Sequence, residues 1–195
     1  MWNSSRSLAI IFNGEIYNYR ELRSRLSANG YQFRSHCDTE VLLALYQTRG
    51  EAMLNELHAR FGGVWHINAH SMKAMGRRKG QSIPRDDFVL GDLKGESCDP
   101  EFTAFVAETL QGFGYSVKLN HPFKGAALVQ RFGRPQDGRH SLQIEVNRGL
   151  YMDEEKIEKT ANFDTLKRDI DRLLAAVAGF VAQQIRGFPE AREGE

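Results

Sequence analysis

The sequence is poor in cysteine and has no long apolar segment. Its two cysteines, Cys37 and Cys98, have no paired spacing, which argues against a disulfide framework and favours a reducing cytoplasm. No apolar run approaches the roughly 20 residues that cross a bilayer, and the run near Met1 is too short for a secretion signal. The 26 Lys and Arg and 25 Asp and Glu residues nearly cancel. We therefore expect a cytoplasmic protein without a nucleic-acid or membrane partner.

The most informative stretch is residues 141–152, SLQIEVNRGLYM, whose period of two predicts a strand. One face of this strand is apolar, with Leu142, Ile144 and Val146. The other face is polar, with Gln143, Glu145 and Asn147, and Arg148 follows. Residues 64–70 alternate in the same way and place His66, Asn68 and His70 on one face. The polar faces fit either the wall of a functional site or a solvated strand surface, and the second strand favours the site.

Strands alternate with helices from residue 64 onward. Strands are predicted at 64–70, 88–90 and 115–119, and residues 71–86 are predicted to be a basic loop. Helices are predicted after Asp99-Pro100, over 125–132 and, as a long amphipathic helix, over 163–181. This alternation predicts an α/β fold with a partly parallel sheet.

The first quarter of the chain predicts a smaller α+β fragment. A strand at 8–12, a turn at Asn13-Gly14, a helix from Tyr19 to Asn29-Gly30, a short strand at 31–34 and a helix capped by Asp38 are expected. Residues 51–61 predict a further helix, which leads into Gly62-Gly63 without a Pro- or Ser-rich linker.

The segments FNGEIYNYRELR and CDTEVLLALY, between about residues 8 and 48, resemble class II glutamine amidotransferases, most closely the glutaminase domain of asparagine synthetase. The resemblance implies an oxyanion hole at Asn13 and Gly14, and at Asp38 a contact to the amino group of glutamine. That family uses an N-terminal cysteine nucleophile, whereas this chain begins Met1-Trp2. A turn and a helix cap account for the same residues, so we do not expect glutamine hydrolysis.

Three later segments, ELHARFGGVWHINAHSMKAMG, DFVLGDLKGESCDP and NHPFKGAALVQRFGRPQDGRHSLQIEVNRGLYMDE, resemble the N-formylglutamate amidohydrolase family. The resemblance covers about residues 51–180. It implies part of a zinc-carboxypeptidase-like mixed sheet flanked by helices. It also implies hydrolysis of N-formyl-L-glutamate, a small-molecule substrate, to formate and glutamate, a late step of histidine degradation.

The same resemblance implies roles for individual residues. His70 corresponds to a zinc ligand, and Glu145 to the carboxylate that takes a proton from the attacking water. Arg148, Lys124 and Arg131 are candidate contacts to substrate carboxylates, with Asn120 as a polar contact. A lone strand histidine is also compatible with a hydrogen-bonded structural role, which we expect for His66. Cys98 is expected to be a small buried residue rather than a nucleophile.

The upstream zinc ligands that the resemblance calls for, a His followed three residues later by a Glu, are missing. His36 and His58 are followed at that spacing by Thr39 and Phe61. We expect an amidohydrolase-like domain at 51–187 with impaired zinc binding, an asparagine-synthetase-like fragment at 1–50 and a disordered tail at 188–195. The alternative is an inactive fusion that acts at most as a binding fragment and self-associates through an exposed sheet edge.

Overall fold

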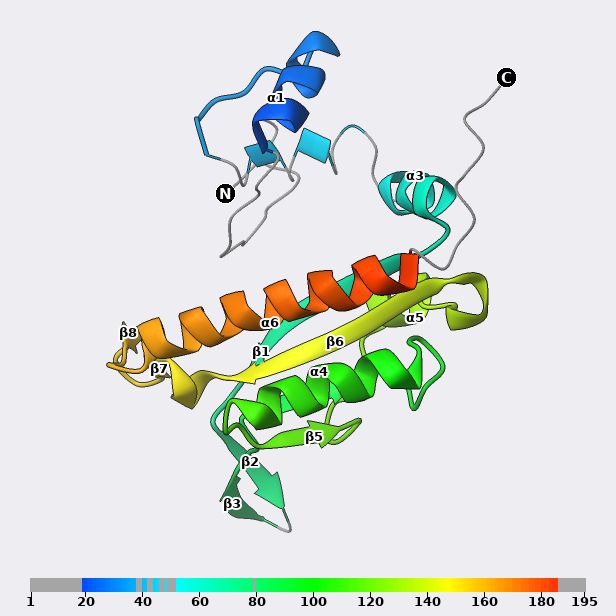
Figure 1. The fold of residues 1–195 in the computed structure, drawn as a ribbon. Coiled ribbons are helices and arrows are strands. Elements are labelled where there is room, and N and C mark those ends of the chain that lie inside the picture. Colours follow the sequence, from blue (N-terminus) through cyan, green and yellow to red (C-terminus); the bar gives the residue numbers. More distant parts are fainter. Residues whose placement is uncertain are drawn as a thin grey trace. The chain divides into compact units, whose positions relative to one another are not determined.

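The computed structural model describes residues 19–37, 40–41, 44–45, 48, 52–78 and 80–185. The chain divides into two compact units, Met1–Leu57 and His58–Glu195 (Figure 1). The predicted strand at 8–12, the Asn13-Gly14 turn, the Asp38 cap and the tail at 188–195 lie outside the described residues. The domain boundaries predicted at residues 50 and 187 stay predictions.

The first unit contains the predicted helix, α1 (Tyr19–Ala28), whose residue Leu26 is buried with Val41 and Ala44. Gly30 ends the helix with a φ of 90°, a conformation that glycine adopts without strain. The helix predicted over 51–61 is α3 (Ala52–Phe61), and the division between the units falls within it.

The predicted strand at 31–34 is wrong, because residues there bind a side chain instead of a neighbouring strand. The backbone N–H groups of Arg34 and Ser35 each donate to the Glu40 carboxylate over 2.8 Å, and the Ser35 hydroxyl donates over 2.7 Å. Burial acts to raise the pKa of Glu40, but these hydrogen bonds and the charge of Arg23 outweigh it and lower the pKa. The segment is therefore fixed by one buried carboxylate.

The second unit is built on a four-stranded sheet in the order β1-β6-β4-β5. Its strands are β1 (Val64–Met72), β4 (Phe88–Gly91), β5 (Val117–Leu119) and β6 (Arg139–Asn147). The β1–β6 and β4–β5 pairs are parallel and the β4–β6 pair is antiparallel. The predicted mixed sheet, flanked by helices, is confirmed.

Two long helices, α4 (Pro100–Gly112) and α6 (Phe163–Ile185), pack on the apolar face of this sheet (Figure 1). The core between them is formed by buried side chains of both layers, among them Phe88, Leu90, Phe102, Val106, Leu110, Leu142, Ile144 and Leu173. Asp99 caps α4 as predicted, because its Oδ1 accepts a hydrogen bond from the Glu101 N–H over 2.8 Å. Each fully buried Leu or Phe contributes about 1.5–3 kcal/mol.

The predicted loop at 71–86 is wrong, because most of it forms an antiparallel hairpin of β2 (Met75–Arg78) and β3 (Gln81–Pro84). Gly80 lies in the turn with a φ of 82°, a conformation that two-residue hairpin turns require. The remaining elements are α5 (Ala127–Phe132), the 3₁₀ turns η1 (Pro135–Asp137) and η2 (Arg148–Leu150), and a small β7 (Met152–Asp153) and β8 (Glu158–Lys159) pair.

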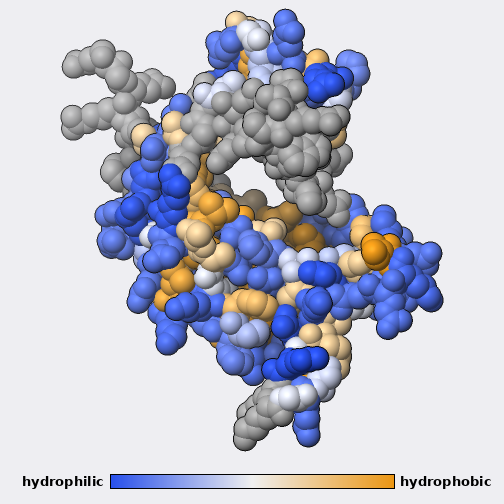
Figure 2. All heavy atoms as spheres, turned by 180° about the vertical axis from the view of Figure 1, so that it is seen from behind, coloured by the Kyte–Doolittle hydropathy of each residue, from blue (hydrophilic) through white to orange (hydrophobic). Residues whose placement is uncertain are grey.

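Apolar residues are exposed at several places on the described surface. Figure 2 shows one face, on which hydrophobic and hydrophilic residues are mixed. Some exposed large hydrophobic residues come from different elements, such as Leu119, Leu128, Ile157 and Leu174, whereas Met75 and Ile83 belong to one hairpin. None of the described helices combines the length and the apolar composition that crossing a bilayer requires.

Candidate functional site

The polar faces of β1 and β6 meet as a ladder of three facing pairs. The parallel register sets His66 opposite Ser141, Asn68 opposite Gln143 and His70 opposite Glu145. The first two pairs are joined by hydrogen bonds of 2.8 Å and 3.4 Å. In the third, His70 Nδ1 lies 3.6 Å from Glu145 Oε1. The two strands that carry the period-two pattern thus lie side by side and form one wall, an adjacency that the pattern alone does not predict.

Glu145 is a buried residue of the last of these three pairs. It is 5% exposed, and its Oε1 accepts a hydrogen bond from Gln143 Nε2 over 2.9 Å. Gln143 is itself fixed, because its Oε1 accepts a hydrogen bond from the Ala126 N–H over 2.8 Å. Gln143 and Asn147 are also buried, so the alternative of a solvated strand face is excluded. A buried carboxylate needs such a donor, because burying an unpartnered charge is costly.

His70 differs from Glu145 in being accessible, with 40% of its side chain exposed. Catalytic zinc sites use three protein ligands and keep one open position. In the part of the chain that the structure describes, no three His, Cys, Asp or Glu side chains lie close enough to hold a metal ion. The His70–Glu145 pair therefore does not fit a complete zinc centre.

His66 and Cys98 have the structural roles that the sequence predicts. His66 Nδ1 pairs with Ser141 Oγ, its ring packs edge-on against Phe132, and burial lowers its pKa. Cys98 is fully buried, and burial raises the pKa of its thiol to about 12. A thiol with that pKa is not a nucleophile at neutral pH.

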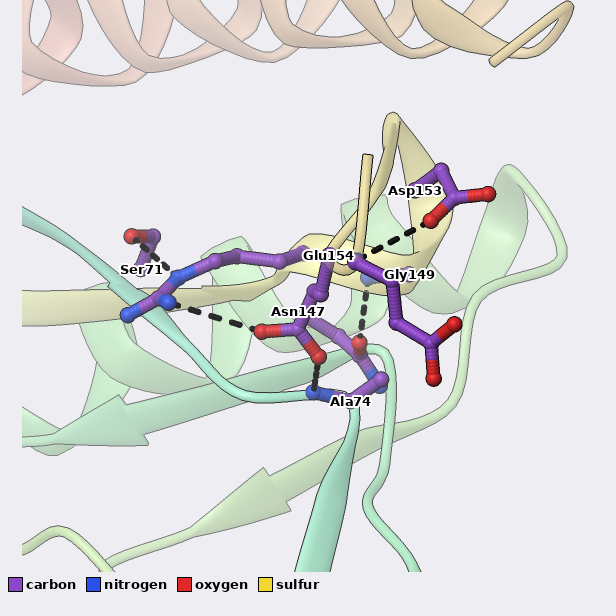
Figure 3. A network of polar contacts seen from close by, with 8 residues as sticks. Ser71, Ala74, Asn147, Gly149, Asp153 and Glu154 are labelled. Atoms are coloured by element: carbon purple, nitrogen blue, oxygen red, sulfur yellow. Dashed lines mark hydrogen bonds and ion pairs between the residues drawn. The ribbon is translucent and has the colours of Figure 1, made fainter. Parts of the chain in front are cut away.

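Arg148 follows β6 at the same end of the wall as His70 and Glu145. Its Nε donates to Ser71 Oγ over 3.2 Å, and its Nη1 lies 3.4 Å from Glu154 Oε1 (Figure 3). Glu154 is fixed in turn, since its Oε2 accepts a hydrogen bond from the Ala74 N–H over 2.8 Å. The guanidinium is partly exposed and is held at the end of two adjacent strands, where an anionic group can reach it.

The other predicted contacts lie between β5 and the end of α5. The Asn120 side chain is hydrogen-bonded to a neighbouring loop. Its Oδ1 accepts hydrogen bonds from the Asp92 and Lys94 N–H groups, and its Nδ2 donates one to Asp92 Oδ1. Lys124 is exposed, and its carbonyl accepts the Leu93 N–H over 2.7 Å. Arg131 is exposed in the last turn of α5. Their substrate roles stay predictions.

The three residues predicted to bind glutamine, Asn13, Gly14 and Asp38, lie outside the described residues. Their roles therefore stay predictions as well.

Comparison with known proteins agrees with both resemblances. Residues 44–152 match the family described as N-formylglutamate amidohydrolase, which is more than half of the chain. The chain belongs to the N-formylglutamate amidohydrolase family. Residues 1–82 also match the glutamine amidotransferase domain, so the two matches overlap at 44–82.

The matched amidohydrolases and asparagine synthetases each align with only part of this chain. The N-formylglutamate deformylase of Pseudomonas aeruginosa is 31% identical over 152 residues, which is 74% of this chain and 54% of that protein. The crystal structure of N-formylglutamate amidohydrolase from Ralstonia eutropha JMP134 is 38% identical, with a TM-score of 0.65 over 75% of this chain and 57% of that chain. Asparagine synthetase 1 of Bacillus subtilis is 52% identical over 62 residues, or 31% of this chain and 10% of that protein. The chain thus spans about half the length of the matched amidohydrolases.

Two residues that hold candidate site residues in place were not predicted as site residues. Gln143 was placed on the polar face, but its link to Ala126 depends on a loop that the strand pattern does not reveal. Glu154, the partner of Arg148, gives no periodic signal. The sequence signal that could have pointed to Glu154 is an acidic residue six positions after the candidate Arg148.

Proposed function

We propose that the chain carries the general-base wall of an amidohydrolase that acts on N-formyl amino acids such as N-formyl-L-glutamate. The observation that carries this proposal is Glu145, a buried carboxylate held by Gln143 beside the accessible His70. A carboxylate with one fixed orientation next to an open edge is suited to proton transfer. Membership in the amidohydrolase family supports the substrate class.

The proposed reaction adds water across the formyl C–N bond. Glu145 takes a proton from water as the water oxygen bonds to the formyl carbon. The C–N bond then breaks, the nitrogen takes that proton from Glu145, and formate and glutamate leave. Gln143 keeps the carboxylate oriented, and Arg148 pairs with a substrate carboxylate in the geometry that guanidinium groups favour.

Zinc, the cofactor that the family resemblance implies, would need ligands from outside the described residues to join His70. This shortage of ligands favours a second candidate function, in which the chain binds an N-formyl amino acid without hydrolysing it. Histidine degradation and a cytoplasmic location belong to the proposal. The buried Cys98, which forms no disulfide bond, supports a reducing compartment.

Formate release from N-formyl-L-glutamate tests the proposal, with zinc supplied and the substrate-dependent heat of binding measured in parallel. Glu145→Gln removes the base and keeps the shape, and Glu158→Gln on exposed β8 is the matched control. Hydrolysis that Glu145→Gln lowers by about a hundredfold or more, and Glu158→Gln leaves unchanged, is expected. Binding without formate release establishes the second candidate, and neither binding nor release contradicts both.

A further inference from the structure

Among the strands that the structure describes, β1 forms one edge of the sheet. Its hydrogen-bonded neighbour is β6, and among the described residues no other strand pairs with it. Ala69, His70 and Ser71 are exposed along this edge. In a parallel ladder alternate residues direct both their N–H and C=O groups away from the neighbour, so one set of β1 donors and acceptors has no partner strand among the described residues.

The two edges of the sheet differ in how they are protected. Edge strand β5 has three residues, and Lys118 lies at its centre. Edge strand β1 has nine residues, VWHINAHSM, without a Pro, Gly, Lys, Arg, Asp or Glu. Short length and charge prevent edge-to-edge pairing, and a long uncharged edge invites it.

We propose that β1 pairs antiparallel with β1 of a second copy of this chain, centred on Asn68. The sequence of the strand is complementary to itself in this register. Trp65 faces the partner's Ser71, and Ile67 faces the partner's Ala69, so each large side chain meets a small one. Asn68 faces the partner's Asn68, which allows an amide pair at the symmetry axis.

This register also keeps the two faces of the sheet continuous. Opposed residues in an antiparallel pair point to the same side, and the even-numbered positions of each copy meet even-numbered positions of the other. His70 then faces the partner's His66 on the side that carries Glu145. The polar wall of one copy continues into the wall of its partner, and twofold symmetry closes the assembly at a dimer.

Disulfide cross-linking tests the register of the proposed β1–β1 pair. Opposed residues in an antiparallel pair have Cα atoms about 4.5–5.5 Å apart, within the range that a disulfide spans. In a Cys37→Ser background, Asn68→Cys should oxidise to a covalent dimer. Ser71→Cys, which faces the partner's Trp65, is the matched control and should cross-link at least tenfold less. Equal cross-linking of both variants would overturn the register.

Sedimentation velocity measures the association without any substrate, so its result is independent of the proposed hydrolysis. A dimer is expected, and Ala69→Lys should weaken it roughly tenfold or more, because each copy places a charge against the partner's Ile67. Leu119→Lys on the β5 edge is the control and should leave the dimer intact. Circular dichroism checks that both variants fold. A monomeric wild-type chain, or a dimer that Ala69→Lys leaves unchanged, would overturn the proposal.

Discussion

At the scale of single residues, the polar wall depends on Gln143 as much as on Glu145. Gln143 donates to the Glu145 carboxylate and accepts the Ala126 N–H, so it connects the base to the chain segment that covers it. Glu145 keeps one orientation because this amide is fixed from both sides. Replacing the amide removes a hydrogen-bond partner of Glu145, of Asn68 and of the Ala126 N–H.

We predict that Gln143→Leu lowers the free energy of unfolding by about 2–4 kcal/mol, since each unsatisfied buried group costs about 1–3 kcal/mol. Urea unfolding followed by circular dichroism measures this loss. Gln111→Leu, on an exposed position of α4, is the matched control and should change stability by less than about 0.5 kcal/mol. Equal stability of the two variants would show that the Gln143 hydrogen bonds are dispensable.

His66 predicts a specific response to acid. Burial lowers its pKa in the folded chain below the value of about 6.5 expected in the unfolded chain. The unfolded chain therefore takes up a proton first as the pH falls. Neutral His66 therefore makes its full contribution to the free energy of unfolding above pH 6.5. This contribution is lost as the pH falls through the folded-state pKa.

We predict that the free energy of unfolding falls below pH 6.5 with a slope of at most about 1.4 kcal/mol per pH unit from this group. His140, whose pKa burial also lowers, adds to the slope. His66→Gln should reduce the slope, and His121→Gln, at an exposed position, should leave it unchanged. Chemical unfolding at several pH values gives the comparison, and a slope that His66→Gln does not change would contradict this assignment.

The sequence predicts part of the polar wall formed by β1 and β6. The period of two in 64–70 and 141–147 predicts both strands and a polar face on each. It predicts neither that the two strands are neighbours nor that their polar faces are buried, because the β1–β6 pairing and the Gln143–Ala126 contact join segments that are distant along the chain. Burial of a polar face depends on tertiary packing and not on the local pattern.

At the scale of elements, α4, β4 and α6 follow from capping and hydrophobic periodicity, whereas the β2–β3 hairpin does not. All the residues of β3 are exposed, so the hairpin has no alternation of apolar and polar residues to reveal it. Its pairing rests on backbone hydrogen bonds and the Gly80 turn. A basic, glycine-containing segment therefore predicts a loop where a hairpin forms.

Strand β4 ends where another backbone segment passes close to it, and this contact gives a prediction at the element scale. A Cβ added at Gly91 would lie 2.6 Å from the Gly125 nitrogen, whereas one added at Gly112 in α4 would meet nothing within 4 Å. We predict that Gly91→Ala destabilises the chain by about 1–3 kcal/mol. Gly112→Ala, the matched control, should stabilise it by about 0.5–1 kcal/mol. Thermal unfolding of both variants measures the difference, and a Gly91→Ala variant as stable as wild type would contradict this close contact.

At the scale of the whole molecule, two family resemblances meet in one chain. The amidohydrolase match supplies the sheet, the polar wall and Arg148, while the glutamine amidotransferase match covers the first unit. The described residues bring His70 and Glu145 together without a third metal ligand. The proposed chemistry therefore depends on this pair and on how firmly it can bind a metal ion.

Zinc titration of the metal-free chain measures how firmly the His70–Glu145 pair can hold a metal ion. We predict weak binding, with a dissociation constant above roughly 1 μM, because two side chains hold zinc less firmly than three or four. We also predict that His70→Ala abolishes this binding, while His121→Ala at an exposed position does not. Stoichiometric zinc that is held far more tightly and survives His70→Ala would show that the metal binds elsewhere.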